Sequence, residues 1–557
     1  MRYFGITSLI LCGILVPVVG QGGSLTAGPV VPSRGADDQP LLRVDPLLVA
    51  QAAEVWGVLA RKENPVWPGW DATATPLLFY LPDVQDVLIN HPRPPQGFHK
   101  YTGPVQFPGA TIMVRDGHTF FQLDGQNTVV DVAGVPTLVV ADTLSNRRNT
   151  LRGLLEDPRP AREKVNGLTW RQLQGDPYQG LCMIAHEAFH AFQRRQAPDK
   201  PGSEAALARY PVLTVANTVG FALEGGALAE MLRARHAPDI RRHALRWLAA
   251  RQERRRHLPA EAIAYEDFLE YLEGLAKYVE YRLLEVLEGR TPTPPMAWVQ
   301  GFQGYGDLSK QREELIRQMV QNMRGEVNIN NDPYGVSPLR MRLYFSGMAV
   351  GVLLDRLAPD WKQRIFAREE TLTRLATQAL KPTQEELAAA LAALQAEPGY
   401  APLVERKTQL QQEGAKATDA LVQAIQTGPH TTVVIDYAAL GDLRIGMSYT
   451  PFGVLRVDDH RTIYRLVPIS AHIGTCKLRQ TTDMPLLHDR AAKKLSCQLQ
   501  ETLTPQRLEQ LLGSKPDAHT PILLNKLNLP GVELDGGQAV LQLQHKTLTV
   551  RLLPGKK

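Results

Sequence analysis

The chain has 557 residues, enough for several domains and for a sizeable hydrophobic core. Hydrophobic residues make up 44% of it and charged residues 21%, which excludes a disordered chain, a collagen-like fibre and a polytopic membrane protein. The chain has 62 basic and 57 acidic side chains. The resulting net charge of +5 is small for a chain of this length and does not indicate nucleic acid as a partner.

The first twenty residues have the pattern of a secretory signal peptide. Arg2 precedes an apolar run over residues 4–19, which is short for a membrane span, and small residues come just before Gln21. The pattern predicts cleavage between Gly20 and Gln21 and export to the periplasm or the extracellular space. An uncleaved N-terminal anchor is the alternative. No later segment is long and apolar enough to cross a bilayer, so we expect no transmembrane segment in the mature chain.

Periodicity then predicts a helix followed by a β region. Residues 45–62 place apolar side chains at helical spacing, whereas residues 74–143 are β-like. Asp-Gly pairs at residues 116–117 and 124–125 stand between apolar runs, and such pairs are typical of hairpin turns.

The rest of the chain divides into a helical part and a strand-rich part. Helices are expected from about residue 178 to 428, and Thr383 with Glu386 forms a capping-box pattern at the start of one of them. From residue 431 the apolar residues alternate with period two, which predicts strands.

One motif carries a recognisable metal chemistry. His186, Glu187 and His190 form the pattern H-E-x-x-H in the segment LCMIAHEAFHAF, whose other residues are mainly apolar and suit a helix. On a helix, residues four apart lie on one face, so both imidazoles can reach a single Zn²⁺ ion. Glu187 is turned toward the water that such an ion binds. Two helix-surface histidines beside a glutamate are the alternative interpretation.

A catalytic zinc ion needs a third protein ligand and an open position for water. No further histidine follows His190 closely, so we expect a glutamate from a later helix. Glu224, in FALEGGALAE, and Glu273, in YLEGLAKYVEYR, are both candidates, because each is followed by glycine and has alanine three residues on. The glutamate that is not a ligand would contact another helix or orient a ligand histidine.

The two motifs together resemble those of the gluzincin metallopeptidases, whose third zinc ligand is the glutamate of an E-G-x-A helix. The segment EGLAKY that begins at Glu273 matches the family pattern more fully than the segment around Glu224, so the resemblance favours Glu273. HEAFHAFQ, LEGLAKYVEY and SGMAVGVLLDRLAPDWK also resemble segments of exported bacterial proteins with a zinc-peptidase site. The resemblance covers residues 180–360. The chain departs from compact gluzincins in the longer interval between His190 and Glu273.

We therefore expect an exported multidomain α+β protein with a zincin-like catalytic unit and a C-terminal mainly-β module. In the catalytic unit, a β region precedes the H-E-x-x-H helix and the glutamate-bearing helices. The expected organisation is a signal peptide (1–20), a linker (21–44), a metallopeptidase domain (45–362), a helical segment (363–430) and a β-rich domain (431–557).

The mechanism that the resemblance implies follows from the metal. Zinc polarises the scissile carbonyl and acidifies its water, while Glu187 acts as general base and passes the proton to the leaving amine. The oxyanion needs a hydrogen-bond donor, and Tyr278, Tyr281 and Tyr344 are candidates among which the sequence does not select. The β region before the site helix is placed to offer an edge strand to an extended peptide.

Three cysteines remain after the signal peptide. Cys476 and Cys497 lie close together in the strand-rich tail, where an oxidising compartment would let them form a disulfide, and two reduced, buried thiols are the alternative. Cys182 shares a helical face with His186. A buried structural thiol is the preferred interpretation of Cys182, and a fourth metal ligand is the other.

Two further features are expected to be structural. Residues 233–257 are rich in arginine but contain a single tryptophan, Trp247, which favours a solvated helix face over a basic patch for nucleic acid, glycan or lipid headgroups. Ser346, Gly347 and Gly351 share one helical stretch and indicate close helix packing, since no phosphate-loop pattern occurs.

The leading hypothesis is therefore zinc-dependent hydrolysis of a peptide bond in a peptide or protein substrate. It implies Zn²⁺ as cofactor. The alternative is a catalytically silent, exported binding or envelope-assembly protein whose metal is structural or absent.

Overall fold

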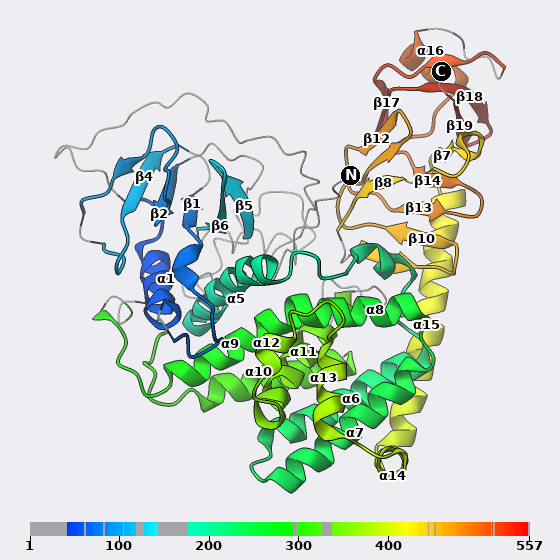
Figure 1. The fold of residues 1–557 in the computed structure, drawn as a ribbon. Helices are drawn as coiled ribbons and strands as arrows, with labels where there is room; N and C mark the ends of the chain where they lie inside the picture. Colours follow the sequence, from blue (N-terminus) through cyan, green and yellow to red (C-terminus); the bar gives the residue numbers. More distant parts are fainter. Residues whose placement is uncertain are drawn as a thin grey trace.

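The computed structural model describes residues 42–554 with gaps at residues 61–62, 82–83, 104, 118–126, 143–175, 295, 297–298, 300, 326–336, 444, 451–452, 514 and 516–518. The expected signal peptide with its cleavage site, most of the linker, and the Asp-Gly pair at 124–125 lie outside the described residues. The fold is mixed α and β, with a sheet near the N-terminus, a helical middle and a sheet-rich C-terminal region (Figure 1).

The N-terminal region is a helix and a six-stranded sheet, as its periodicity predicted. The strand order is β3-β4-β2-β1-β6-β5, and only β1 and β6 pair in parallel. Gly117, just after β4, has the left-handed φ of +80° that its predicted turn requires, but the residues after it are not described. The elements are α1 (Pro46–Leu59), β1 (Leu77–Leu81), β2 (Gln85–Ile89), β3 (His99–Lys100), β4 (Ile112–Asp116), β5 (Thr128–Val132) and β6 (Val135–Ala141).

The middle of the chain is helical, as predicted. Thr383 and Glu386 form the expected capping box, each side chain bonding the other's backbone N–H. The elements are α5 (Pro177–Gln196), η3 (Glu204–Arg209), α6 (Val215–Arg233), α7 (Ala237–Arg255), α8 (Ala260–Leu269), the π-helical turn η4 (Glu270–Gly274), α9 (Leu275–Leu287), α10 (Ser309–Arg324), α11 (Ser337–Leu357), α12 (Trp361–Arg364), α13 (Leu372–Leu380), α14 (Gln384–Gln395) and α15 (Tyr400–Thr427).

Helix α5 lies at the junction of the sheet and the helical body (Figure 1). It begins at Pro177, which pre-sets the first helical φ, and the side chain of Asp176 accepts a hydrogen bond from the N–H of Tyr178. Helix α5 packs against β5 and β6 on one side and against α9 on the other. This enclosure explains why α5 is apolar over most of its surface.

The C-terminal region contains two sheets. One has the order β15-β18-β19-β7-β14-β13-β10-β9, and the other has the order β16-β17-β12-β11-β8. The elements are β7 (Thr432–Asp436), η6 (Ala438–Leu440), β8 (Gly446–Ser448), β9 (Val454–Arg456), β10 (Arg461–Tyr464), β11 (Ser470–Ile473), β12 (Cys476–Gln480), β13 (Leu486–Asp489), β14 (Lys494–Gln498), α16 (Pro505–Leu512), β15 (Ile522–Leu523), β16 (Leu527–Leu529), β17 (Val532–Asp535), β18 (Gln538–Gln544) and β19 (Thr547–Leu553).

This β region is attached to the helical body at two places. The long helix α15 runs from the helical body along the side of the sheets, where it packs against β7, β13 and β14 (Figure 1). Strand β9 packs against η3, and the buried hydroxyl of Thr462 on β10 donates to the carbonyl of Ala208 at 3.0 Å.

The prediction of a disulfide between Cys476 and Cys497 is wrong, and the alternative of two reduced, buried thiols is confirmed. Cys476 lies on β12 and Cys497 on β14, in different sheets, and both thiols are free and buried. Nearness in sequence misleads here because the chain passes from one sheet to the other between the two residues. Burial raises the pKa of Cys497 to about 12 and that of Cys476 to about 11, so both remain unreactive thiols at neutral pH.

Among the described residues, no helix has both the length and the apolar character needed to cross a bilayer.

Candidate metal centre

Three side chains from two helical segments converge below the sheet. His186 and His190 stand one turn apart on α5, and Glu273 projects from η4. Oε2 of Glu273 lies 3.6 Å from Nε2 of His186 and 3.4 Å from Nε2 of His190. One potential ligand atom from each residue lies within 4.8 Å of the other two, and all three side chains are buried. The structure thus brings together both histidines of the motif and one of the two candidate glutamates.

The atoms that face one another in this cluster lack hydrogen-bond partners. Nε2 of both histidines and both carboxylate oxygens of Glu273 are buried without a hydrogen bond of normal geometry, and so is Oε1 of Glu187. Buried polar atoms in folded proteins are nearly always satisfied, so this group calls for a ligand. Two imidazoles and a carboxylate are a usual ligand set for Zn²⁺, and the residues present therefore fit that ion.

A widened helical turn and a close backbone contact position Glu273. The π-helical turn η4 carries it, and single π turns inside helices occur frequently at functional sites. A Cβ atom on Gly274 would stand 2.6 Å from the Cα of Gly347 on α11, so the two backbones touch. A Cβ on Gly351 would likewise stand 2.7 Å from the ring of Tyr278. The close helix packing predicted for the glycines of α11 is confirmed.

The outer nitrogen of His186 is held by a carboxylate that the sequence analysis did not single out. Nδ1 of His186 lies 2.7 Å from Oε1 of Glu280 on α9, and Nζ of Lys277 lies 2.7 Å from the other oxygen of Glu280. This pairing leaves Nε2 of His186 facing the cluster. Glu280 follows Glu273 by two helical turns, so both side chains lie on one helix face. This spacing was the one feature of the sequence that could have indicated Glu280 as a neighbour of the histidines.

The outer nitrogen of His190 is held in a similar way. Nδ1 of His190 lies 2.9 Å from Oε1 of Gln193, whose amide donates to the carbonyl of Tyr271 at 2.6 Å. Gln193 therefore joins the α5 helix to the η4 turn that carries the glutamate. In the sequence, the position of Gln193 one helical turn after His190 was the feature that could have indicated this contact.

Burial and the neighbouring charges shift the protonation of the whole group. Burial raises the pKa of Glu187 to about 8, close to neutrality. Burial opposes a charge on His186, but Glu273 and Glu280 outweigh it and raise the pKa of His186 to about 9. Burial also opposes the charge on Glu273, yet the two nearby histidines and Arg340, whose Nη2 lies 3.6 Å from Oε1 of Glu273, lower its pKa to about 2. Burial lowers the pKa of His190. The cluster thus keeps an ionised carboxylate beside a carboxyl group that titrates near neutral pH.

Glu224 lies outside this cluster. Its two oxygens accept from Nε of Arg251 at 2.9 Å and from Nε of Arg254 at 2.6 Å, and all three side chains are fully buried. These ion pairs occupy the carboxylate of Glu224. Of the two candidate glutamates, Glu273 alone stands beside the histidines.

The same contacts correct part of the expectation of a solvated helix face over residues 233–257, where Arg242 and Arg256 are indeed exposed. Arg251 and Arg254 on α7 are buried, not solvated, because carboxylates on the neighbouring helices compensate their charges. Besides Glu224, Arg251 pairs with Glu270 at 2.6 Å and Arg254 pairs with Glu266. The periodicity of the sequence showed a helix but not which of its arginines would face inward.

The three tyrosines proposed as donors have different surroundings. The ring of Tyr344 stacks on that of His186, with centroids 6.3 Å apart and planes at 23°, and its hydroxyl lies 3.5 Å from Nη2 of Arg340. Tyr278 donates its hydroxyl to Asp355 at 2.6 Å. Tyr281 makes no ring contact or hydrogen bond with the cluster in the described part of the chain. Of the three, Tyr344 alone packs against a histidine of the cluster.

Cys182 is a buried thiol and not a member of the cluster. Its sulfur lies 3.8 Å from the carbonyl oxygen of Glu280, and burial raises the pKa of the thiol well above its usual value. The structural role preferred for this residue fits these surroundings.

No protein-family model, curated protein or solved structure matches this chain.

Proposed function

We propose that this chain is an exported zinc metallopeptidase with a gluzincin-like site, in which His186, His190 and Glu273 hold Zn²⁺ and Glu187 is the general base. The observation that carries the proposal is that potential metal-ligand atoms of His186, His190 and Glu273 converge, without hydrogen-bond partners, beside the buried carboxyl of Glu187. The zincin-like character of the catalytic unit rests on the same arrangement, since the sheet, the H-E-x-x-H helix and the glutamate turn follow one another in that order.

The roles of the residues follow from their surroundings. When bound, zinc would act as a Lewis acid toward a carbonyl oxygen and a water molecule. Glu187 is buried next to the ligands, and its carboxylate would accept a proton from that water and return it to the leaving amine. Tyr344 is the preferred donor to the developing oxyanion, because its ring lies against His186.

The edge of the N-terminal sheet supports a peptide as the substrate. Among the described strands, β5 lies at one edge of the sheet, and it packs against α5, the helix that carries both histidines (Figure 1). An open edge can bind an extended chain through backbone hydrogen bonds. We therefore expect extended peptide segments to be cleaved in preference to folded ones.

The test uses the full chain reconstituted with zinc and a casein-derived fluorogenic substrate. Glu187→Gln should retain one zinc ion per chain while hydrolysis falls by about 10²- to 10⁴-fold, the usual contribution of a general base. His186→Ala should lose both zinc and activity. Hydrolysis by Glu187→Gln at the parental rate would refute the mechanism. A parent protein that binds no metal after reconstitution would favour the catalytically silent binding protein instead.

A further inference from the structure

Arg340 on α11 reaches the third side chain of the metal centre. Nη2 of Arg340 lies 3.6 Å from Oε1 of Glu273. The other oxygen of this carboxylate, Oε2, lies 3.4 Å from Nε2 of His190 and 3.6 Å from Nε2 of His186. Arg340 and Glu273 are both buried. The two oxygens of Glu273 therefore have different neighbours, a guanidinium for one and the histidines for the other.

The same guanidinium nitrogen also lies beside the tyrosine that we prefer as oxyanion donor. Nη2 of Arg340 is 3.5 Å from the hydroxyl oxygen of Tyr344, which stands one turn further along α11. The ring of Tyr344 in turn stacks on His186. Arg340 thus contacts two of the groups that the proposed zinc site uses, and a rotation of its side chain would move it away from both.

A carboxylate from outside the site holds the other side of Arg340. Nη1 of Arg340 bonds Oε1 of Glu204, the first residue of η3, and Oε2 of Glu204 accepts from the hydroxyl of Tyr265 on α8 at 3.2 Å. The β region holds η3 itself, since the carbonyl of Ala208 accepts from Thr462. Arg340 thus lies between two carboxylates, and this compensation allows a charged group that is 1% exposed.

This placement gives Arg340 a positioning role and not a direct contact with substrate. One amino group faces Glu204 and the other faces Glu273, and the side chain is buried. The planar guanidinium presents its amino groups in a fixed geometry, so it can span two carboxylates at once, which the point charge of a lysine cannot do. An arginine at this position therefore fixes the direction of the Glu273 carboxylate as well as compensating its charge.

We propose that Arg340 is a positioning residue of the zinc site, which pairs with Oε1 of Glu273 so that Oε2 is presented to the metal, and that Glu204 keeps Arg340 in place. This inference rests on the proposed function, since it assigns Arg340 to the same site. It predicts that the Glu204–Arg340 pair sets zinc affinity although neither residue is a ligand. Partners that orient a metal ligand in this way typically raise metal affinity by about 10- to 100-fold.

Zinc affinity of the full chain, measured by competition with a chromophoric chelator, tests the proposal. Removing Arg340 alone would also change the charge around the metal, so the main variant is Arg340→Met/Glu204→Gln, which removes one cation and one anion. It should bind zinc about 10- to 100-fold more weakly than the parent, because Glu273 loses its orientation. The visible spectrum of the Co²⁺-loaded protein, which depends on the ligand geometry, should change as well.

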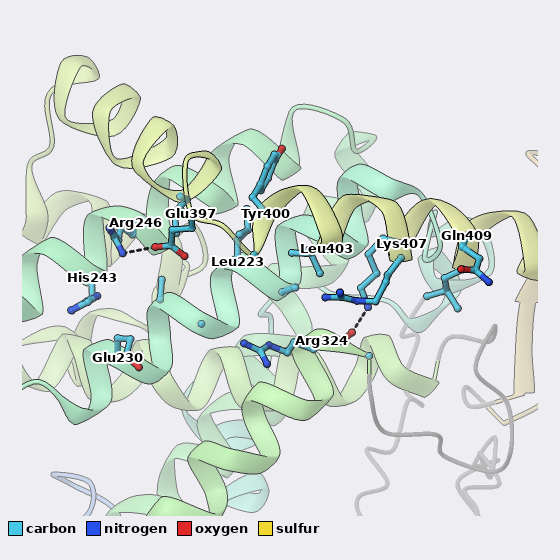
Figure 2. Close-up of a pocket in the computed structure, with 18 of the residues that line it drawn as sticks. Leu223, Glu230, His243, Arg246, Arg324, Glu397, Tyr400, Leu403, Lys407 and Gln409 are labelled. Carbon is cyan, nitrogen blue, oxygen red and sulfur yellow. Dashed lines mark hydrogen bonds and ion pairs between the residues drawn. The ribbon is translucent and has the colours of Figure 1, made fainter.

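Two control variants carry the same substitutions elsewhere. Arg254→Met/Glu266→Gln removes a buried pair between α7 and α8 that contacts none of the three cluster residues in the described part of the chain. Arg246→Met/Glu397→Gln removes a partly exposed pair, 2.9 Å apart, at one end of a groove between α6 and α15 (Figure 2). No residue that lines this groove belongs to the metal cluster. Both controls should keep the parental zinc affinity and the parental cobalt spectrum.

Arg340→Lys serves as the second variant if the double variant does not fold. Lysine keeps the charge but cannot pair with both carboxylates, so zinc affinity should fall by a smaller factor, about threefold or more. Parental zinc affinity in a folded double variant or in Arg340→Lys would refute the positioning role and leave the proposed peptidase intact. A parent protein that binds no zinc would instead refute both.

Discussion

Nδ1 of His186 lies 2.7 Å from Oε1 of Glu280, and Lys277 holds the other oxygen of that carboxylate. The ring of one histidine of the proposed zinc site is therefore held by a Lys277–Glu280 ion pair on α9, the helix that directly follows the turn carrying Glu273. In such an arrangement the carboxylate both orients the imidazole and raises its basicity.

Replacing Glu280 should weaken metal binding without removing a ligand. We expect Glu280→Gln to lower zinc affinity by about 10- to 100-fold, because His186 loses an anionic partner but keeps its Nε2. Competition with a chromophoric chelator measures the change. Glu285→Gln is the matched control, since Glu285 lies on the same helix and pairs with Arg282 away from the cluster. Equal affinities of the two variants would show that the contact does not tune the metal.

Zinc affinity should rise with pH. In the metal-free protein the two carboxylates raise the pKa of His186 to about 9, so zinc must displace a proton from this ring at neutral pH. Each unit of pH between about 7 and 9 should increase the apparent affinity by up to about tenfold. The same chelator assay at three pH values checks the slope. A flat profile over this range would mean that His186 is already neutral.

Replacing each of the two candidate glutamates should affect a different property, stability for Glu224 and zinc binding for Glu273. Glu224→Ala leaves two buried arginines without their shared carboxylate, and we expect it to lower the free energy of unfolding by about 3–5 kcal/mol. Glu273→Ala should instead abolish zinc binding. Urea unfolding in the presence of a chelator, with metal analysis of the folded proteins, separates the two effects. Zinc loss in a folded Glu224→Ala variant, with zinc retained by Glu273→Ala, would reverse the assignment.

Two glycine substitutions test the backbone contact beneath Glu273. A Cβ on Gly347 would stand 2.7 Å from the Cα of Gly274, so Gly347→Ala should destabilise the protein by about 1–3 kcal/mol and loosen zinc. Gly226→Ala adds the same methyl group to another helix, where nothing lies within 4 Å. It should stabilise the protein by about 0.5–1 kcal/mol. Thermal melting of both variants provides the comparison, and equal shifts would contradict the packing argument.

The sequence predicted what depends on local periodicity. The helical spacing of His186 and His190, the capping box at Thr383 and the alternation after residue 431 all appear in the structure where they were expected. These features follow from a few neighbouring residues, so no knowledge of the rest of the chain was needed.

Long-range placement was beyond such reasoning. Glu224 and Glu273 have similar surroundings in the sequence, and only the packing of α7 shows that one carboxylate belongs to arginines and the other to histidines. The pairing of Cys476 with Cys497 failed for the same reason, because assignment to one sheet or the other depends on strands far away in the chain. Glu280, the anionic partner of His186, was missed because a glutamate two helical turns after Glu273 belongs to no distinctive sequence motif.

The π-helical turn η4 has a consequence for how this chain can change. Glu270 bonds Arg251 and Ser346 on one side of the turn, while Glu273 faces the histidines of α5 on the other. The extra residue in the turn sets the rotation between these two faces, and each residue of a helix advances it by about 100°. Deleting one residue there would restore a regular helix and turn the glutamate away from the histidines. The deletion of a single codon would therefore convert the complete three-residue cluster into two histidines without their carboxylate.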